Sequence, residues 1–368
     1  DPKELVGKAG LARIGTFKEV NGVKRDFKYK ETPYGSVFAP GEIGKYSAKI
    51  SAITKSIMGS EGIVLVYSQY IEGGLIPIAL ALEELGLTRY VGRMSKSKTL
   101  FAAAPSEPLD FDTMKPRGAR VGAGVRTAKY AMITGDKSIS PNNLEEINAA
   151  TGDANADGSV VKVVLISQAG SEGLDFIAIR QVHVLEPWYN MNRIEQIIGR
   201  AVRWCSHRKL PFTKRNVEIF LYSTMLEGND ANMEAADLYV YRLAEAKAVQ
   251  IGAVARVLKK TAVDCLLNLE QVGFTVSDIG QTVKQELSSG KTIQYPVGDK
   301  PFTAACDYME NCAYKCRPDA DLDEDDVKLD TFSEAFILMN TDKIVQRVRQ
   351  LMKDRFFYTK EELITSIN

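Results

Sequence analysis

One short stretch near the middle of the chain places fixed positive charges at helical spacing. In QIIGRAVRWCSH, which begins at Gln196, the side chains of Gln196, Arg200 and Arg203 would share one helix face because they are spaced i, i+4 and i+7. Arg193 and His207 extend this row by a turn at each end. The residues between them are mostly apolar and can pack inward. We therefore expect an amphipathic helix whose polar stripe meets an anionic group.

A second segment that could do chemistry lies upstream of this helix. VVLISQAGSEGLDF, residues 163–176, indicates a buried strand that runs into a loop with two glycines and two acids. Glycines let the backbone approach a ligand closely and turn N–H groups toward phosphate. Asp175 could accept a hydrogen bond from a ribose hydroxyl, and Ser167 and Gln168 could contact a sugar-phosphate backbone. An ordinary tight turn explains this segment equally well when it is taken alone.

The elements around these two segments alternate between strands and helices. This alternation predicts an α/β fold, a parallel sheet with helices on both faces. Ligands of such sheets bind beyond the carboxyl ends of the strands, so the loops after residues 167 and 187 and the start of the arginine-bearing helix should face the site. The strands are expected near 62–69, 87–92, 129–136, 159–167, 181–187 and 216–224, and the helices near 42–58, 71–86, 141–151 and 190–204.

The chain has 368 residues, which suggests more than one structural unit. Thr359 and Glu362 have the spacing of a capping box, so the last segment should hold a capped helix. That segment could begin a winged-helix nucleic-acid module or be a plain packing hairpin. The expected divisions are a lead-in at 1–40, the α/β domain at 41–228 with a long, mobile, locally basic insertion at 93–128, a helical and cysteine-containing extension at 229–318, an acidic linker at 319–330 and a helical pair at 331–368.

Composition and cysteine usage exclude several classes of protein. Formal net charge is zero and 45% of residues are apolar, which argues against a polybasic protein. Because no apolar run reaches about 18 residues, we expect no membrane span. Five cysteines in no disulfide framework fit a reducing compartment. The spacing of Cys306, Cys312 and Cys316 is uncommon for zinc, so we expect reduced core cysteines and no metal site.

Together, these segments resemble the motifs of superfamily 2 helicases. The strand end S-x-A-G-S-E-G-x-D resembles motif V, and Q-x-x-G-R-x-x-R resembles motif VI. GIVLVYSQY, from Gly62, is similar to motif IV, and ITGD, from Ile133, resembles the strand-end step that contacts the nucleic-acid backbone. VLEPWYN, QIIGRAVRWCSHRKLP and CDYMENCAYKC narrow the likeness to helicase-type ATPases of large nucleocytoplasmic DNA viruses, of the poxvirus early transcription factor small subunit and nucleoside triphosphatase I types.

This resemblance implies a RecA-like fold and a role for each matching residue. In that family the two motif VI arginines point at the γ-phosphate of ATP, and one acts as an arginine finger. By resemblance, Arg200 and Arg203 are that pair and Gln196 is the neighbouring polar contact. The implied nucleotide-binding residues are Glu172, Gly173 and Asp175, and the implied nucleic-acid-binding residues are Ser68, Gln69, Thr134, Gly135, Ser167 and Gln168.

Two parts of a complete enzyme of this kind do not occur in the sequence. There is no phosphate loop G-x-x-x-x-G-K-[ST] and no acidic Mg²⁺ site after a strand. SSGKT, from Ser288, has the right ending, but Gln285 stands where the first glycine belongs. We therefore expect the second RecA-like domain of a longer protein, whose missing N-terminal RecA-like domain holds most of the ATP and Mg²⁺. The isolated chain should not hydrolyse ATP.

The resemblance also implies partners and a place of action. The whole protein would be a nucleic-acid-dependent ATPase of viral transcription or DNA metabolism, located in the viral factory of the host cytoplasm or in the virion. DNA is the expected nucleic acid, a viral RNA polymerase or a transcription-factor subunit is a candidate protein partner, and no membrane is involved. The alternative is a non-catalytic platform of a viral transcription factor that binds nucleic acid or protein.

Overall fold

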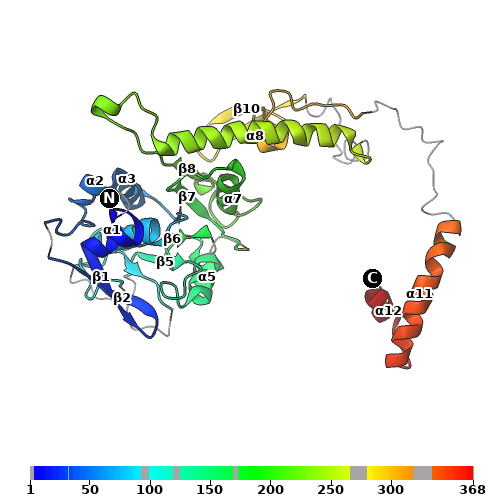
Figure 1. Cartoon of the computed structure of the whole chain (residues 1–368), viewed down its shortest axis with the longest axis horizontal. Coiled ribbons are helices and arrows are strands. Elements are labelled where there is room, and N and C mark those ends of the chain that lie inside the picture. Colours follow the sequence, from blue (N-terminus) through cyan, green and yellow to red (C-terminus); the bar gives the residue numbers. More distant parts are fainter. Residues whose placement is uncertain are drawn as a thin grey trace. The chain divides into compact units, whose positions relative to one another are not determined.

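A six-stranded sheet forms the core of the α/β domain, with the strand order β4-β5-β6-β3-β7-β8 and parallel pairing between all neighbours. This confirms the predicted α/β fold (Figure 1). The strands are β3 (Ile63–Tyr67), β4 (Thr88–Arg89), β5 (Lys129–Ile133), β6 (Val163–Ile166), β7 (Ile179–Val184) and β8 (Glu218–Leu221). This computed structural model describes residues 4–31, 33–92, 99–118, 125–168, 173–265, 280–317 and 334–367.

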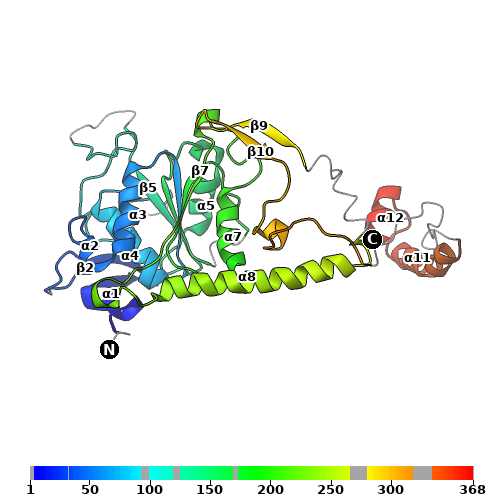
Figure 2. The same ribbon diagram turned by 90° about the horizontal axis from the view of Figure 1, so that it is seen from above.

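Alternate residues of the central strand β3 enter two separate hydrophobic cores. Val64 and Val66 join the core under α3 and α4, whereas Leu65 and Tyr67 join the core under α5 and α7. The period of two arises because successive side chains of a strand point to opposite faces. Helices therefore cover both faces of the sheet, as Figure 2 shows. Their bounds are α3 (Ala48–Gly59), α4 (Ile76–Glu84), α5 (Asn143–Thr151) and α7 (Met191–Ala201).

The N-terminal lead-in packs onto the first of these cores. Phe27, Val37 and Phe38 are buried in the same cluster as α3 and α4. Asn21 and Gly22 have φ values of 52° and 76°, which suit a two-residue turn between antiparallel strands. The lead-in elements are α1 (Gly7–Ile14), β1 (Gly15–Val20) and β2 (Val23–Tyr29). The short helix α2 (Ile43–Tyr46) follows them, and a π-helical turn (Ile71–Leu75) precedes α4.

The described part of the insertion predicted at 93–128 is anchored to the domain at several points. Leu100, Phe101 and Leu109 are buried in the core. The carboxylate of Glu83 accepts hydrogen bonds from the backbone N–H groups of Leu100, at 2.7 Å, and Phe101, at 3.3 Å. Tyr130 Oη also donates to this carboxylate, at 2.6 Å. A buried acid on α4 thus ties the insertion to the domain.

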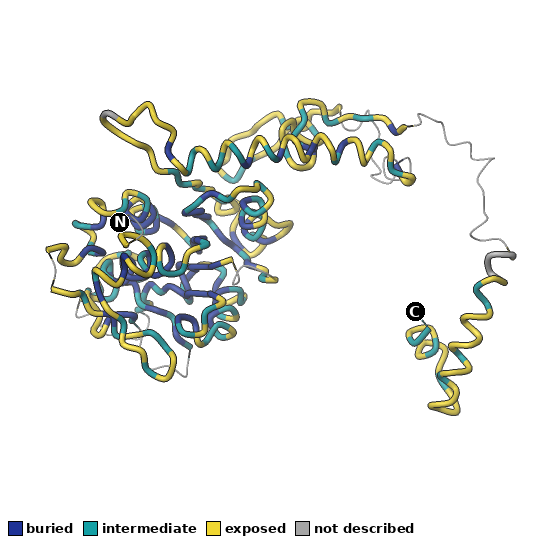
Figure 3. Tube along the Cα trace, viewed as in Figure 1, coloured by how far each residue is buried: buried dark blue, intermediate teal, exposed yellow. Residues whose placement is uncertain are grey.

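The C-terminal part contains long helices and a hairpin. Figure 3 shows that its described residues are largely exposed, in contrast to those of the buried sheet. SSGKT forms the turn of the hairpin and the first residue of β10, with Gly290 at φ +77°, which is a hairpin and not a phosphate loop. The acidic linker at 319–330 lies outside the described residues. The elements are α8 (Ala236–Thr261), β9 (Thr282–Glu286), β10 (Thr292–Pro296), α11 (Glu334–Asp354) and α12 (Lys360–Ile367).

Contacts divide the chain into two compact units. One comprises Asp1–Ala255 and Thr275–Cys312, and the other Arg256–Phe274 and Ala313–Asn368. In the second unit the predicted capping box is confirmed. The Thr359 N–H donates to Glu362 Oε2 at 2.9 Å, and the Glu362 N–H donates to Thr359 Oγ1 at 3.2 Å. No helix in the described ranges is both long and apolar enough to cross a membrane.

The prediction of reduced core cysteines is wrong in the structure. Cys265 and Cys316 form one disulfide with Cα atoms 5.8 Å apart, and Cys306 and Cys312 form another with Cα atoms 4.7 Å apart. Both separations lie in the range that a disulfide can bridge. Sequence spacing hid the first pair because 51 residues separate its members. The described residues hold no group of three or more His, Cys, Asp or Glu side chains arranged to bind a metal ion.

Candidate functional site

The arginine-bearing helix is α7, and its amphipathic character is confirmed. Ile194, Ile197 and Ala201 are buried, the last two in the core under α5 and α7, whereas Gln196 is exposed. The helix ends at Ala201, before the predicted end at residue 204. Arg203 therefore lies just past the helix.

The polar stripe of α7 faces the segment that follows β6. Arg193 Nη1 donates to Gln168 Oε1 at 3.1 Å, beside the carboxyl end of β6. About two helical turns later, Arg200 Nη1 donates to the carbonyl oxygen of Leu174 at 2.9 Å. Segments predicted separately from their sequence patterns are thus neighbours in space.

Arg203 continues this row with an ion pair to Asp175. Its Nε also donates to the carbonyl oxygen of Gly199 at 3.2 Å. The side chains of Arg203 and Asp175 are 41% and 76% exposed. An exposed ion pair contributes about 0–1 kcal/mol, so another anion can displace Asp175 at little cost.

The polar stripe does not stay at the carboxyl edge of the sheet, where we expected the start of this helix to face the site. Arg193 lies there, but α7 then runs back along β7. The Ala178 N–H donates to the carbonyl oxygen of Ser206 at 3.0 Å, and His207 Nε2 lies 2.6 Å from the carbonyl oxygen of Ile179, where β7 begins. His207 is therefore engaged by the backbone, and Arg200 and Arg203 lie beside the chain that returns to the start of β7.

The predicted nucleic-acid residues follow β3, β5 and β6, which are neighbours in the sheet. They fall into a buried and an exposed set. The buried hydroxyl residues shape the loops from within, whereas the exposed and half-buried residues are accessible to a ligand. The buried set is Ser68, Thr134 and Ser167, and the accessible set is Gln69, Gly135 and Gln168.

Ser68 is held by an acid that we did not include among the site residues. Its Oγ donates to Glu186 Oε1 at 2.5 Å, and the Gln69 N–H donates to Glu186 Oε2 at 3.3 Å. Burial raises the pKa of the Glu186 carboxyl to about 7. Gly74 leaves room for this contact, since an added Cβ would collide with Ser68 Oγ. Glu186 thereby joins the ends of β3 and β7.

Thr134 is similarly engaged within the protein. Its Oγ1 lies 3.0 Å from Ser140 Oγ and accepts a hydrogen bond from the Asp136 N–H at 3.2 Å. Among the predicted nucleotide residues, Gly173 is exposed with φ +72°, a backbone conformation that favours glycine. Glu172 lies outside the described residues.

A cavity of about 320 Å³ borders the stripe on its other side. Trp188 lies there under the guanidinium of Arg193, at 3.9 Å from ring centroid to Cζ. Sequence patterns missed this pairing and the cavity, whose walls include Gln196, Lys247 and Tyr308. A larger cavity of about 750 Å³ lies beside α1, and none of the predicted site residues lines it.

Comparison with known protein families matches the part of the chain that holds this site. Residues 125–205 match the family described as the helicase conserved C-terminal domain. This segment of the chain is therefore similar to helicase C-terminal domains. The matched range begins before β5 and ends after Arg203, so it includes the loop after β6 and the whole arginine-bearing helix.

Proteins similar to this chain include proteins of large DNA viruses, which confirms the predicted resemblance. One is a putative ATP-dependent RNA helicase of Acanthamoeba polyphaga mimivirus, 37% identical over 134 residues, or 35% of this chain and 16% of the relative. Another is the termination factor NPH-I homolog of African swine fever virus (isolate Tick/Malawi/Lil 20-1/1983). It is 30% identical over 239 residues, which cover 61% of this chain and 33% of the relative. A third is a putative helicase of Invertebrate iridescent virus 3. It is 26% identical over 286 residues, which cover 76% of this chain and 24% of the relative.

These matches span only 16% to 33% of the length of the three relatives. Among solved structures, the C-terminal part of the Fun30 ATPase domain matches with a TM-score of 0.33 and 15% identity, covering 56% of this chain and 50% of that one.

Proposed function

We propose that this chain forms the arginine-bearing half of an ATP-driven nucleic-acid motor. Arg200 and Arg203 would act on the γ-phosphate of an ATP whose phosphates and Mg²⁺ are held by a separate RecA-like domain. The observation that supports this most is that both guanidinium groups lie on the loop after β6, and that of Arg203 is partly open to solvent. Phosphoryl transfer is catalysed by charge placed on the moving phosphate, and an arginine finger contributes about 10³- to 10⁵-fold in rate.

The remaining predicted residues support this chemistry in different ways. Asp175 holds Arg203 until a nucleotide arrives, and the phosphate then takes the place of the carboxylate. Gln196 is exposed on the same helix face and supplies a neutral hydrogen-bonding contact. Gly173 lets the loop come close to the nucleotide, and Glu172 is assigned to the same loop.

The nucleic-acid track would run along the ends of β5, β6 and β3. Gln69, Gly135 and Gln168 are the accessible groups, and we propose that they contact the sugar-phosphate backbone directly. The buried Ser68, Thr134 and Ser167 act by fixing the loops that carry them. Contacts of this kind do not read sequence, and affinity that depends on phosphates weakens as salt rises.

The relatives suggest a setting for this activity. We propose DNA as the nucleic acid, a viral RNA polymerase or transcription-factor subunit as a protein partner, and action in the viral factory of the host cytoplasm or in the virion. The rival proposal is a non-catalytic platform that keeps the fold and binds nucleic acid or protein without turnover.

Steady-state ATPase assays on the longer protein that carries both domains separate these two proposals. Arg203→Ala should lower kcat by about 10³-fold or more while leaving nucleotide binding largely intact. Arg208→Ala is the matched control, because Arg208 is an exposed arginine a short distance further along the chain. Equal turnover in both variants and the parent would remove Arg203 as the finger. The present chain alone should show negligible hydrolysis.

A further inference from the structure

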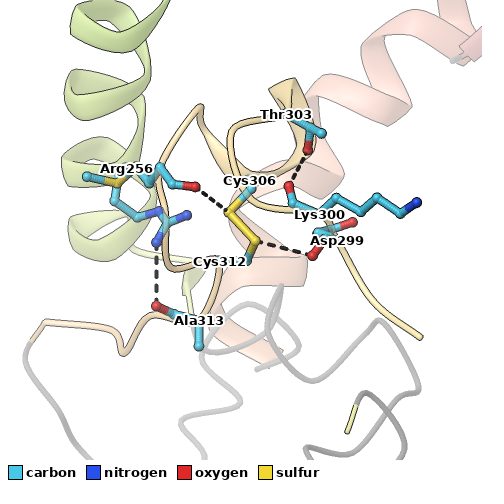
Figure 4. Close-up of a disulfide and its surroundings, with 8 residues drawn as sticks. Arg256, Asp299, Lys300, Thr303, Cys306, Cys312 and Ala313 are labelled. Atoms are coloured by element: carbon cyan, nitrogen blue, oxygen red, sulfur yellow. Dashed lines mark hydrogen bonds between the residues drawn. A yellow bond between two sulfur atoms is a disulfide. The ribbon is translucent and has the colours of Figure 1, made fainter. Parts of the chain in front are cut away.

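A disulfide-closed loop lies beside the arginine-bearing helix within the first unit. Cys306 and Cys312, six residues apart, form the bridge, and Cys306 is fully buried. Figure 4 shows the bridge next to Asp299, whose carbonyl oxygen lies 3.3 Å from Cys312 Sγ. The bridge therefore ties the loop at both its ends.

The middle of this loop has an unusual backbone. Asp307 and Tyr308 have φ values of 53° and 54°, which lie in the left-handed region that residues other than glycine rarely adopt. Consecutive residues in this region persist only where the surroundings fix them. Here the Tyr308 N–H donates to the carbonyl oxygen of Thr303 at 2.9 Å, and the Asp307 N–H donates to that of Ala304 at 3.1 Å. These bonds and the disulfide set the direction in which the Tyr308 side chain leaves the loop.

The loop contacts two helices, one on each side. The carbonyl oxygen of Asp307 packs against Gly252 of α8, where an added Cβ would collide with it. Tyr308 Oη donates to Glu195 Oε1 of α7 at 2.6 Å. Burial and the neighbouring Glu195 carboxylate raise the pKa of Tyr308 well above its usual value, so the hydroxyl stays a donor at neutral pH.

The Tyr308 contact spans a gap between these helices. The cavity of about 320 Å³ lies there, and Gln196, Ala248 and Tyr308 are among the residues that line it. Glu195 directly precedes Gln196, the first polar residue of the stripe that continues to Arg200 and Arg203. A hydrogen bond to Glu195 therefore restrains the rotation and position of the whole stripe.

We propose that Tyr308 is a positioning residue for the arginine-bearing helix and that the Cys306–Cys312 disulfide holds Tyr308 in place, so that thiol reductants loosen α7. The effect on turnover rests on the proposed function above. Reduction breaks the S–S bond and adds two electrons and two protons, which yields two thiols, while a dithiol reductant such as dithiothreitol is oxidised to its cyclic disulfide. The loop then loses the closure that maintains Asp307 and Tyr308.

Hydrogen exchange of the α7 amides in this chain tests the proposal without any need for catalysis. Reduction, Cys312→Ser and Tyr308→Phe should each speed exchange over Met191–Ala201 by about fivefold or more, since local opening is governed by the contacts that hold an element. Glu195→Gln should exchange as the parent does, because an amide oxygen still accepts the Tyr308 hydrogen bond. Cys265→Ser removes the other disulfide and should keep the response to reductant.

Two results would overturn the proposal that Tyr308 and the Cys306–Cys312 disulfide hold α7 in position, which we call the clamp. One is unchanged α7 exchange in both Tyr308→Phe and Cys312→Ser. The other is an equal response to reductant in Cys312→Ser and the parent chain, which would place the effect elsewhere.

ATPase assays on the longer protein provide the second readout. Tyr308→Phe should lower kcat by about 10-fold, with KM for ATP within twofold, because a small displacement of a catalytic group costs rate more than binding. Glu195→Gln keeps an acceptor for the Tyr308 hydroxyl, so this variant should retain most of the parent kcat. If Arg203→Ala abolishes turnover but Tyr308→Phe and Cys312→Ser leave kcat unchanged, the clamp fails and the motor stands. If Arg203→Ala itself leaves kcat unchanged, the motor fails, and α7 exchange still decides the clamp.

Discussion

Arg203, just past the C-terminal end of α7, forms an ion pair with Asp175 in the loop that leads from β6 to β7. The pair links the two segments in which the sequence concentrates its candidate chemistry. Its exposure decides how it can act. A buried pair would be part of the framework, whereas an exposed pair is weak enough to exchange one anion for another.

Asp175→Asn should therefore change folding stability little. We expect the free energy of unfolding to shift by less than about 1 kcal/mol, because the pair is exposed and screened by solvent. Urea denaturation of the parent and the variant at the same ionic strength measures this shift. A loss above about 2 kcal/mol would identify the pair as structural and argue against its exchange for a phosphate.

The Glu186 carboxyl should give the domain a measurable pH dependence. Its pKa is raised from 4.5 to about 7, so the folded state binds a proton that the unfolded state has lost between these pH values. The protonated Glu186 carboxyl contributes fully to the stability of the folded state below pH 4.5, and this contribution is lost as pH rises through 7. Glu186→Gln removes this titration, and the stability of the parent relative to the variant should fall by about 3 kcal/mol between pH 4.5 and pH 8.

Urea denaturation across this pH range provides the test for Glu186. Parallel stability profiles for the parent and Glu186→Gln would show that the carboxyl titrates normally. Ser68 would then donate its hydrogen bond to a Glu186 carboxyl with an ordinary pKa.

Gln168 should contribute to nucleic-acid binding without affecting the fold. It is exposed at the end of β6 and accepts a hydrogen bond from Arg193. Gln168→Ala would lose one hydrogen bond to a phosphate, so it should weaken the binding of nucleic acid by about 3- to 10-fold. Fluorescence anisotropy with duplex DNA at a fixed, low salt concentration measures this loss. Gln294→Ala on β10 is the control, and equal affinities for the two variants would contradict the proposed track.

Periodicity and motif spacing were sufficient to predict the sheet, its two helical layers and the amphipathic arginine-bearing helix. The continuous apolar run of β3 and the i, i+4, i+7 stripe are local patterns, so they can be recognised without a structure. The order of the motifs also predicted which loops would lie at the ends of β3, β5 and β6.

Pairings between distant residues could not be predicted in this way. The bond between Ser68 and Glu186 joins residues more than a hundred positions apart, and so does the bond between Glu195 and Tyr308. Neither partner has a sequence pattern that names the other. The anchoring of the insertion could not be predicted for the same reason, because the acid that anchors it, Glu83, lies on the preceding helix.

The Glu83 anchor can be tested directly. Glu83→Ala would leave the buried N–H of Leu100 and the hydroxyl of Tyr130 without their acceptor. Each unsatisfied buried donor costs about 1–3 kcal/mol, so the variant should lose about 3 kcal/mol of stability. Glu61→Ala, an exposed acid before β3, should lose less than about 0.5 kcal/mol. Equal denaturation midpoints for both variants would show that the insertion does not depend on Glu83.

The central claim is that the guanidinium of Arg203 leaves Asp175 to meet a terminal phosphate. A structure of the longer two-domain protein with ADP, Mg²⁺ and a metal-fluoride mimic of the transferring phosphoryl group measures this most directly. We predict that Arg203 Nη lies within hydrogen-bond distance, about 3 Å, of a fluoride, with the ion pair to Asp175 broken. An Arg203 side chain that remains paired with Asp175 and distant from the fluorides would contradict the account.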